Sequence, residues 1–142
     1  MHVPDSFGLA LAVTGGLGAG LIICLSFLVA PLVFKTVDGP AASRFLRALF
    51  PRYYRALLAL AAVATGLALA GAPAGLWAAA SWLVAAAASV VLVPAINSAR
   101  DAGTAGAARF RRLHGLSVGL NLIMLLACAW IVAAIARLPL QV

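Results

Sequence analysis

The chain has 142 residues, of which 65% are hydrophobic and 9% charged, and its mean hydropathy is +1.14. Soluble domains carry about 25% charged residues, so this composition excludes a water-soluble fold of this size. The net charge of +7 would suit a nucleic-acid-binding surface. Nine of the ten basic residues, however, lie in two short stretches between apolar runs, which indicates membrane topology instead. We therefore expect a lipid bilayer, and no nucleic acid, as a partner.

The apolar runs predict four membrane-spanning helices in a single domain, 1–142. A helix needs about 20 apolar residues to cross the hydrocarbon core. Uncharged runs of 29, 44 and 24 residues follow Asp5, Arg55 and Arg112. The longest run accommodates two helices, because the Gly-Ala-Pro-Ala-Gly sequence at 71–75 is typical of a turn. The predicted helices are about 7–34, 56–71, 76–97 and 114–136.

The basic residues predict the orientation of this four-helix bundle. Short basic connections stay on the cytoplasmic side of a membrane, so both termini and the 71–75 turn are expected outside (N-out/C-out). The expected membrane is the inner (cytoplasmic) membrane of a bacterium. Tyr53 and Tyr54 are expected at the membrane interface, where aromatic rings prefer to lie. The two basic connections contain Lys35, Arg44, Arg47, Arg52 and Arg55 in the first, and Arg100, Arg109, Arg111 and Arg112 in the second.

Small residues at four-residue intervals predict how the helices pack. Membrane helices associate where small side chains let the backbones approach closely. We expect the predicted stripe of the first helix to face the bundle interior, and the same for Gly115 and Gly119 in the last helix. The stripe of the first helix consists of Gly8, Ala12, Gly16, Gly20 and Cys24.

Two prolines lie near the inner ends of the first and third predicted helices. Pro31 and Pro94 each remove a backbone donor. One interpretation is that they kink the helices and open a vestibule lined by Arg100, Asp101 and His114. The other is that they mark the ends of the helices.

The last helix carries a polar stripe formed by His114, Ser117 and Asn121. Polar groups in hydrocarbon are costly and turn inward to find partners. Asn121 is expected to hydrogen-bond a neighbour such as Thr14 or Thr65, or else to contact a substrate. For His114, an interfacial position and a binding role are both open.

Three sulfur-bearing residues provide a candidate metal site. If the first and last helices pack together, Cys24, Met124 and Cys128 could converge, and thiolate with thioether favours Cu(I). The alternative is apolar packing, the ordinary role of Cys and Met. No cofactor is expected: His2 and His114 are predicted on opposite sides of the membrane, so they cannot share a haem.

Several sequence stretches carry a family resemblance. They are Phe-Leu-Val-Ala-Pro-Leu-Val-Phe-Lys at 27–35, Leu-Phe-Pro-Arg-Tyr-Tyr at 49–54, Pro94 with Arg100-Asp101, and Leu-His-Gly-Leu-Ser at 113–117 followed by Asn121. The chain resembles the transmembrane protein 205-like family, which implies a four-helix membrane domain and supplies no reaction. It is more distantly similar to small bundles that bind haem or belong to copper-resistance systems. Those place a histidine early in the first helix, and 9–14 contain none.

These features favour a non-catalytic membrane protein. The chain has no Glu, and it lacks the spacings of a P-loop, a dinucleotide site or a zinc protease. We expect a transport or tolerance component for a small solute or soft metal, acting as a homo-oligomer. The alternative is an accessory subunit of a larger membrane complex.

Overall fold

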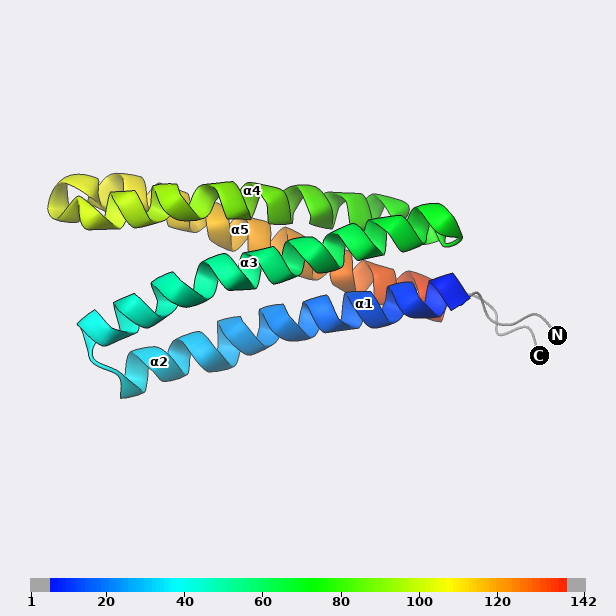
Figure 1. Cartoon of the computed structure of the whole chain (residues 1–142), viewed down its shortest axis with the longest axis horizontal. Coiled ribbons are helices and arrows are strands. Elements are labelled where there is room, and N and C mark those ends of the chain that lie inside the picture. Colours follow the sequence, from blue (N-terminus) through cyan, green and yellow to red (C-terminus); the bar gives the residue numbers. More distant parts are fainter. Residues whose placement is uncertain (1–5, 138–142) are drawn as a thin grey trace.

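The computed structural model describes residues 6–137, and within that range it is an all-α bundle without strands (Figure 1). The first long helix runs through α1 (Ser6–Ile23), a π-helical segment (Cys24–Val29) and α2 (Ala30–Thr36). The other three are α3 (Gly39–Ala70), α4 (Leu76–Asp101) and α5 (Gly103–Ala136), with a short 3₁₀ turn (Pro73–Gly75) before α4. The predicted four-helix class is confirmed.

All four helices are long and apolar enough to cross a membrane, with lengths of 31, 32, 29 and 34 residues. At 1.5 Å per residue they extend about 44–51 Å, against a hydrocarbon core of about 30 Å. The chain is therefore a multi-pass integral membrane protein whose helices continue past the bilayer. Most of the predicted connections at 35–55 and 97–113 are helical, so the predicted helices were too short on the side of these connections.

Local signals explain why the helices begin and end so near one another. The Asp38 side chain accepts a hydrogen bond from the Ala41 backbone N–H at 2.8 Å, which caps α3, and Pro40 occupies its first turn. Gly103 has a φ of +58°, which suits the sharp turn from α4 into α5. Each basic connection therefore needs only one or two non-helical residues.

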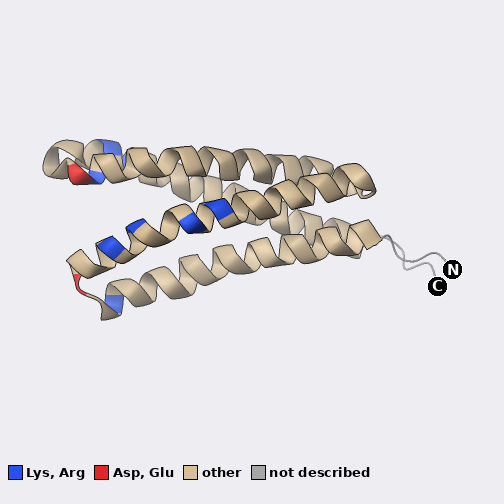
Figure 2. Cartoon of the chain, in the orientation of Figure 1, with Lys and Arg blue, Asp and Glu red and all other residues tan. Residues whose placement is uncertain are grey.

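The two ends of the bundle differ in charge. The α2–α3 and α4–α5 connections lie at one end, and the described chain ends lie at the other with the α3–α4 turn (Figure 1). Figure 2 shows the basic residues gathered toward the first of these ends. We call it the basic end and the opposite one the terminal end.

The helices form a four-membered ring. α1 packs against α3 and α5, and α4 packs against the same two helices, so α1 and α4 lie diagonally opposite, as do α3 and α5. The terminal half of the interior is closed by Leu11, Trp82, Cys128 and Ile131, which have no exposed surface. Trp82 of α4 reaches across to α1, where a Cβ on Gly18 would lie 2.5 Å from its ring.

The interior face of α1 is a different stripe from the predicted one. Its buried positions include residues 8, 11, 15, 18 and 22, which alternate steps of three and four. Such a seven-residue repeat is typical of near-parallel helix packing at about 20°. A Cβ added to Gly16, Gly20, Gly115 or Gly119 would meet no atom within 4 Å. The prediction that these four glycines pack inside the bundle was therefore wrong for the single chain.

The outer surface of the bundle is apolar, as expected against lipid. Leu9, Phe27, Leu69 and Val91 are among the large apolar side chains that are exposed. Trp77 and Trp130 are also exposed and lie together beside a shallow groove between α4 and α5, near the terminal end. Since tryptophan prefers the membrane–water boundary, we expect this pair to lie at the level where the terminal end leaves the hydrocarbon.

Candidate functional site

A cavity with a volume of about 250 Å³ lies in the interior between the Trp82 cluster and the basic end. All four helices line it, and most of the lining is apolar. No Asp, Glu, Lys or Arg is among the lining residues. They are Leu25, Ser26, Ala30, Phe50, Tyr54, Val93, Ile96, Asn97, His114, Ser117, Val118 and Asn121.

A hydrogen-bond network crosses the bundle at the floor of this cavity. The Tyr53 hydroxyl donates to Asn121 Oδ1 at 3.1 Å, and Asn121 Nδ2 donates to the Tyr54 hydroxyl oxygen at 3.1 Å. Tyr54 Oη also lies 2.8 Å from Ser117 Oγ. Either hydroxyl of the Tyr54–Ser117 pair can be the donor. Asn121 uses one of its two N–H groups in this network, which leaves the other N–H available to a ligand.

Other polar groups of the lining have no side-chain partner. Within residues 6–137, the side chains of Ser26, Asn97 and His114 make no hydrogen bond. The His114 ring stacks on Phe110, with centroids 5.6 Å apart and an interplanar angle of 4°. The cavity thus offers several free donors and acceptors from three different helices.

The π-helical segment adds a backbone acceptor to the wall. The Ala30 N–H bonds to the Leu25 carbonyl, so it does not serve Ser26, whose carbonyl it would meet in an α-helix. The next N–H in a π-helix would come from position 31, which is proline and has none. The Ser26 carbonyl therefore lacks its usual helical donor. Segments of π-helix occur frequently at functional sites.

Proline-containing segments from three helices meet at the cavity. Ala30 precedes Pro31, Phe50 precedes Pro51, and Val93 precedes Pro94, and all three of these neighbours line the cavity. Helix continues on both sides of each proline, so the interpretation of Pro31 and Pro94 as helix ends was wrong. The alternative, that Pro31 and Pro94 kink the helices, stays a prediction.

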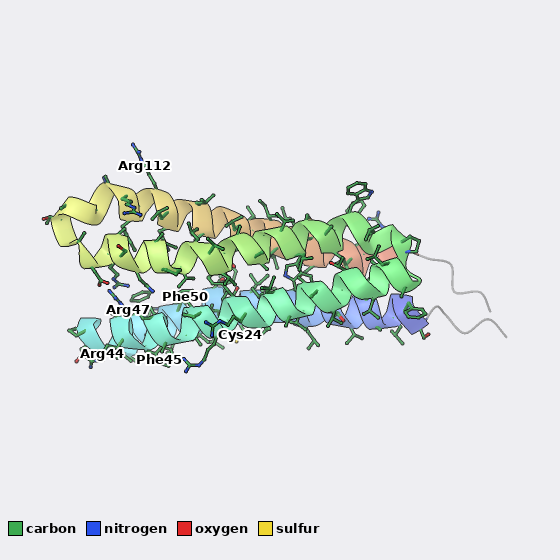
Figure 3. The ribbon with its side chains drawn as sticks, turned by 45° about the horizontal axis from the view of Figure 1, so that its top comes forward. Cys24, Arg44, Phe45, Arg47, Phe50 and Arg112 are labelled. Carbon is green, nitrogen blue, oxygen red and sulfur yellow. The ribbon has the colours of Figure 1, made fainter. Side chains whose placement is uncertain are left out.

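The structure brings together part of the predicted polar site. His114, Ser117 and Asn121 all line the cavity, whereas Arg100 and Asp101 are exposed beyond it. Asp101 instead forms a two-pronged ion pair with Arg47 of α3, in which Nη1 and Oδ2 are 3.0 Å apart. Figure 3 shows Arg47 and Phe50 directed toward the α4–α5 layer, while Arg44 and Phe45 point away from it. The predicted vestibule lined by Arg100, Asp101 and His114 needs this correction.

The expected partners of Asn121 also differ. Thr14 and Thr65 each bond a backbone carbonyl of their own helix, at 2.7 and 2.8 Å, so neither reaches Asn121. Tyr53 and Tyr54 take that place and are 7% and 2% exposed, so their rings face the bundle interior; their position at the membrane interface stays a prediction. A sequence signal for this pairing exists: Tyr54 lies 16 residues before the end of α3 at Ala70, and Asn121 lies 15 before the end of α5 at Ala136. Residues at equal depths in two spanning helices lie at the same level of the bundle, where their side chains can meet.

The three sulfur atoms do not form the predicted metal site. Met124 and Cys128 are fully buried in the terminal half, whereas Cys24 is exposed on the outside of the π-helical segment. The described residues also contain no group of three His, Cys, Asp or Glu side chains suited to a metal ion. His2 lies outside the described residues. The prediction that Cys24, Met124 and Cys128 of one chain together bind Cu(I) is therefore wrong, because Cys24 lies on the outward face of the π-helical segment.

The sequence of this chain matches a known family. A family model described as Domain of unknown function (DUF4149) matches residues 13–105. The chain belongs to the DUF4149 family. The match runs from residue 13, within α1, to the start of α5. It therefore includes the cavity-lining residues of the first three long helices. His114, Ser117 and Asn121 of α5 lie beyond it. No curated protein and no solved structure shows a significant match to the chain.

Proposed function

We propose that this DUF4149 protein binds a small, mainly apolar solute in the cavity between its four helices, as part of a transport or tolerance function. The observation that carries the proposal is the cavity itself, in which free hydrogen-bonding groups converge within an apolar wall. Binding sites for small molecules typically combine these two features. As part of this proposal, we relate the chain to the transmembrane protein 205-like family. That relation implies a four-helix membrane domain and does not supply a reaction.

The packing of the terminal half restricts how transport would work. Trp82, Leu11 and Ile131 close the interior above the cavity, so the described chain has a site but no continuous path. Movement of a solute across the bilayer therefore requires a rearrangement of the helices or a route between copies of the chain.

Photolabelling with a small neutral phenyldiazirine in lipid nanodiscs tests the binding proposal. We expect saturable labelling of the cavity-lining Leu25, Ser117 and Asn121, reduced by excess trifluoromethylbenzene, since that competitor occupies the same cavity. Labelling of lipid-facing Leu122 and Leu126 should not saturate. A Ser117→Phe variant, which fills the cavity, should lose the saturable part. If cavity residues and lipid-facing residues respond identically to the competitor, the proposed function is wrong.

The outward glycines favour a second proposal, assembly with another membrane helix. Gly16 and Gly20 of α1 leave open space at the bundle surface, and small residues four apart permit close helix contacts. A homo-oligomer that is stable in mild detergent and is lost in Gly16→Leu/Gly20→Leu supports oligomeric transport. A different protein that co-purifies with the chain supports the accessory-subunit role instead.

The proposed orientation places the basic end in the cytoplasm of a bacterial inner membrane, because short basic segments are retained there. In a background lacking Cys24 and Cys128, a Cys at the exposed Ser98 position should react with an impermeant thiol reagent only after the membrane is opened. Reaction of this Cys in sealed cells would show that the basic end faces outward, opposite to the proposed orientation.

A further inference from the structure

The depth of the cavity limits the kind of molecule that reaches it. Asn97 follows Trp77 by 20 residues on α4, and His114 precedes Trp130 by 16 residues on α5. At 1.5 Å per residue these steps correspond to about 30 Å and 24 Å. Since the hydrocarbon core is about 30 Å thick, Ser117 and Asn121 lie deeper within it, whereas Asn97 and His114 lie near the level where the core ends on the basic side. That is the depth of the polar head of an amphiphile.

The mouth of the cavity opens sideways toward lipid. Among the lining residues, Ser26, His114 and Val118 are exposed, and they come from the π-helical segment and from α5. The adjoining α2 has no buried residue. The gap between these two elements therefore gives molecules dissolved in the bilayer direct access.

The lining matches a neutral ligand with oxygen atoms on a ring. Without an Asp, Glu, Lys or Arg side chain in the lining, a fully charged ligand would be desolvated without a carboxylate, ammonium or guanidinium partner. Asn97, His114 and Ser117 supply donors for carbonyl oxygens, while the Ser26 carbonyl accepts from a hydroxyl. Phe50 and Tyr54 supply aromatic walls that pack against a planar ring.

We infer that the cavity binds the head group of a neutral, lipid-soluble molecule of the quinone or quinol class, which enters between the π-helical segment and α5. This inference rests on the proposed function and names the ligand class of the same site. It concerns binding alone. The oxygen atoms of the ring take the hydrogen bonds that the lining leaves free, and the tail remains in the bilayer.

The two histidines of the chain permit a specific measurement. Replacing His2 with Ala leaves His114 as the only histidine, so ¹⁵N-histidine labelling in nanodiscs gives one imidazole signal from the cavity. We expect this signal to shift saturably with decylubiquinone and to remain in place with n-decylbenzene, which has the same tail and no oxygen. Asn97→Leu should weaken the affinity about fivefold or more, since it removes one hydrogen bond worth about 1 kcal/mol.

A matched control is available at Ser81, which lies on the outer groove between α4 and α5. Ser81→Ala should bind decylubiquinone like the wild-type chain. Equal shifts with decylubiquinone and n-decylbenzene, or an unchanged affinity in Asn97→Leu, would overturn the quinone inference. No shift with either compound in protein that still shows saturable diazirine labelling would overturn it too, and would leave the proposed function standing. If neither the histidine shift nor the saturable diazirine labelling is observed, both the quinone inference and the proposed function are wrong.

Discussion

Gly106→Leu is expected to open the α4–α5 hairpin and to lower the free energy of unfolding by at least about 3 kcal/mol. A Cβ on Gly106 would overlap the Ala99 carbonyl oxygen and lie 2.8 Å from the Ala102 Cβ. A backbone oxygen cannot rotate away as a flexible side chain can. The two helices must therefore separate at the basic end.

The measurement for this prediction is reversible unfolding in mixed detergent micelles, with Gly115→Leu as the control. Gly115 lies on the same helix, and a Cβ there meets no atom within 4 Å. Replacing glycine by leucine also improves helix propensity by up to about 1 kcal/mol, so the control should be neutral or slightly stabilising. Equal stability of the two variants would mean that α4 and α5 do not approach at Ala99.

Gly18→Leu is expected to disrupt the closed terminal half, again by about 3 kcal/mol or more. A Cβ at Gly18 would lie 2.5 Å from the Trp82 ring and 2.9 Å from Cys128 Sγ, both fully buried. Leucine needs more space than a Cβ, so the Trp82 ring or the α1 backbone would have to move. Gly16→Leu, two residues away, should keep wild-type stability because its Cβ meets open space.

A double variant separates this steric effect from a general effect on α1. Trp82→Ala removes the ring that blocks position 18, so Gly18→Leu should cost less in that background than in the wild-type chain. An identical cost in both backgrounds would show that Trp82 does not reach Gly18. Thermal unfolding in one detergent of the wild-type chain, the two single variants and the double variant provides the comparison.

The fold could be predicted from the sequence because the strongest signals in a membrane protein are long apolar runs and the placement of basic residues. The helix ends could not. Hydropathy detects the part of a helix within lipid, whereas Asp38 and Gly103 determine where the chain leaves the helix beyond it. The basic segments between these points continue as helix, as residues such as Arg and Leu favour.

The packing face of α1 could not be chosen from spacing alone. Glycine occurs at positions 8, 15, 16, 18 and 20, so both a four-residue stripe and a three-and-four stripe contain small residues. The choice depends on a bulky partner, since Trp82 needs the space above Gly18. The sequence does not reveal which residue of α4 lies opposite a given residue of α1.

The site was half visible in the sequence. His114, Ser117 and Asn121 are conspicuous because polar residues in a span are costly. Tyr53 and Tyr54 were placed at the interface instead, since an amphipathic ring suits that position equally well. Their hydroxyls bond Ser117 and Asn121 across the diagonal of the bundle. The matching depths of these residues in α3 and α5 indicate the level of the contact, but the sequence does not show that these two helices face each other.

The interior of the bundle holds a cavity toward the basic end and is filled by packed side chains toward the terminal end, and we expect small molecules to enter only the first of these regions. Cysteine reactivity toward methyl methanethiosulfonate tests it most directly, because a thiol reacts as the thiolate and deep apolar burial suppresses that form. In a chain without Cys24 and Cys128, we predict fast modification of Asn97→Cys and Ser117→Cys, which line the cavity, and slow modification of Ser89→Cys, which is 1% exposed. Equal reactivity at the three positions, or faster reaction at position 89, would contradict the account.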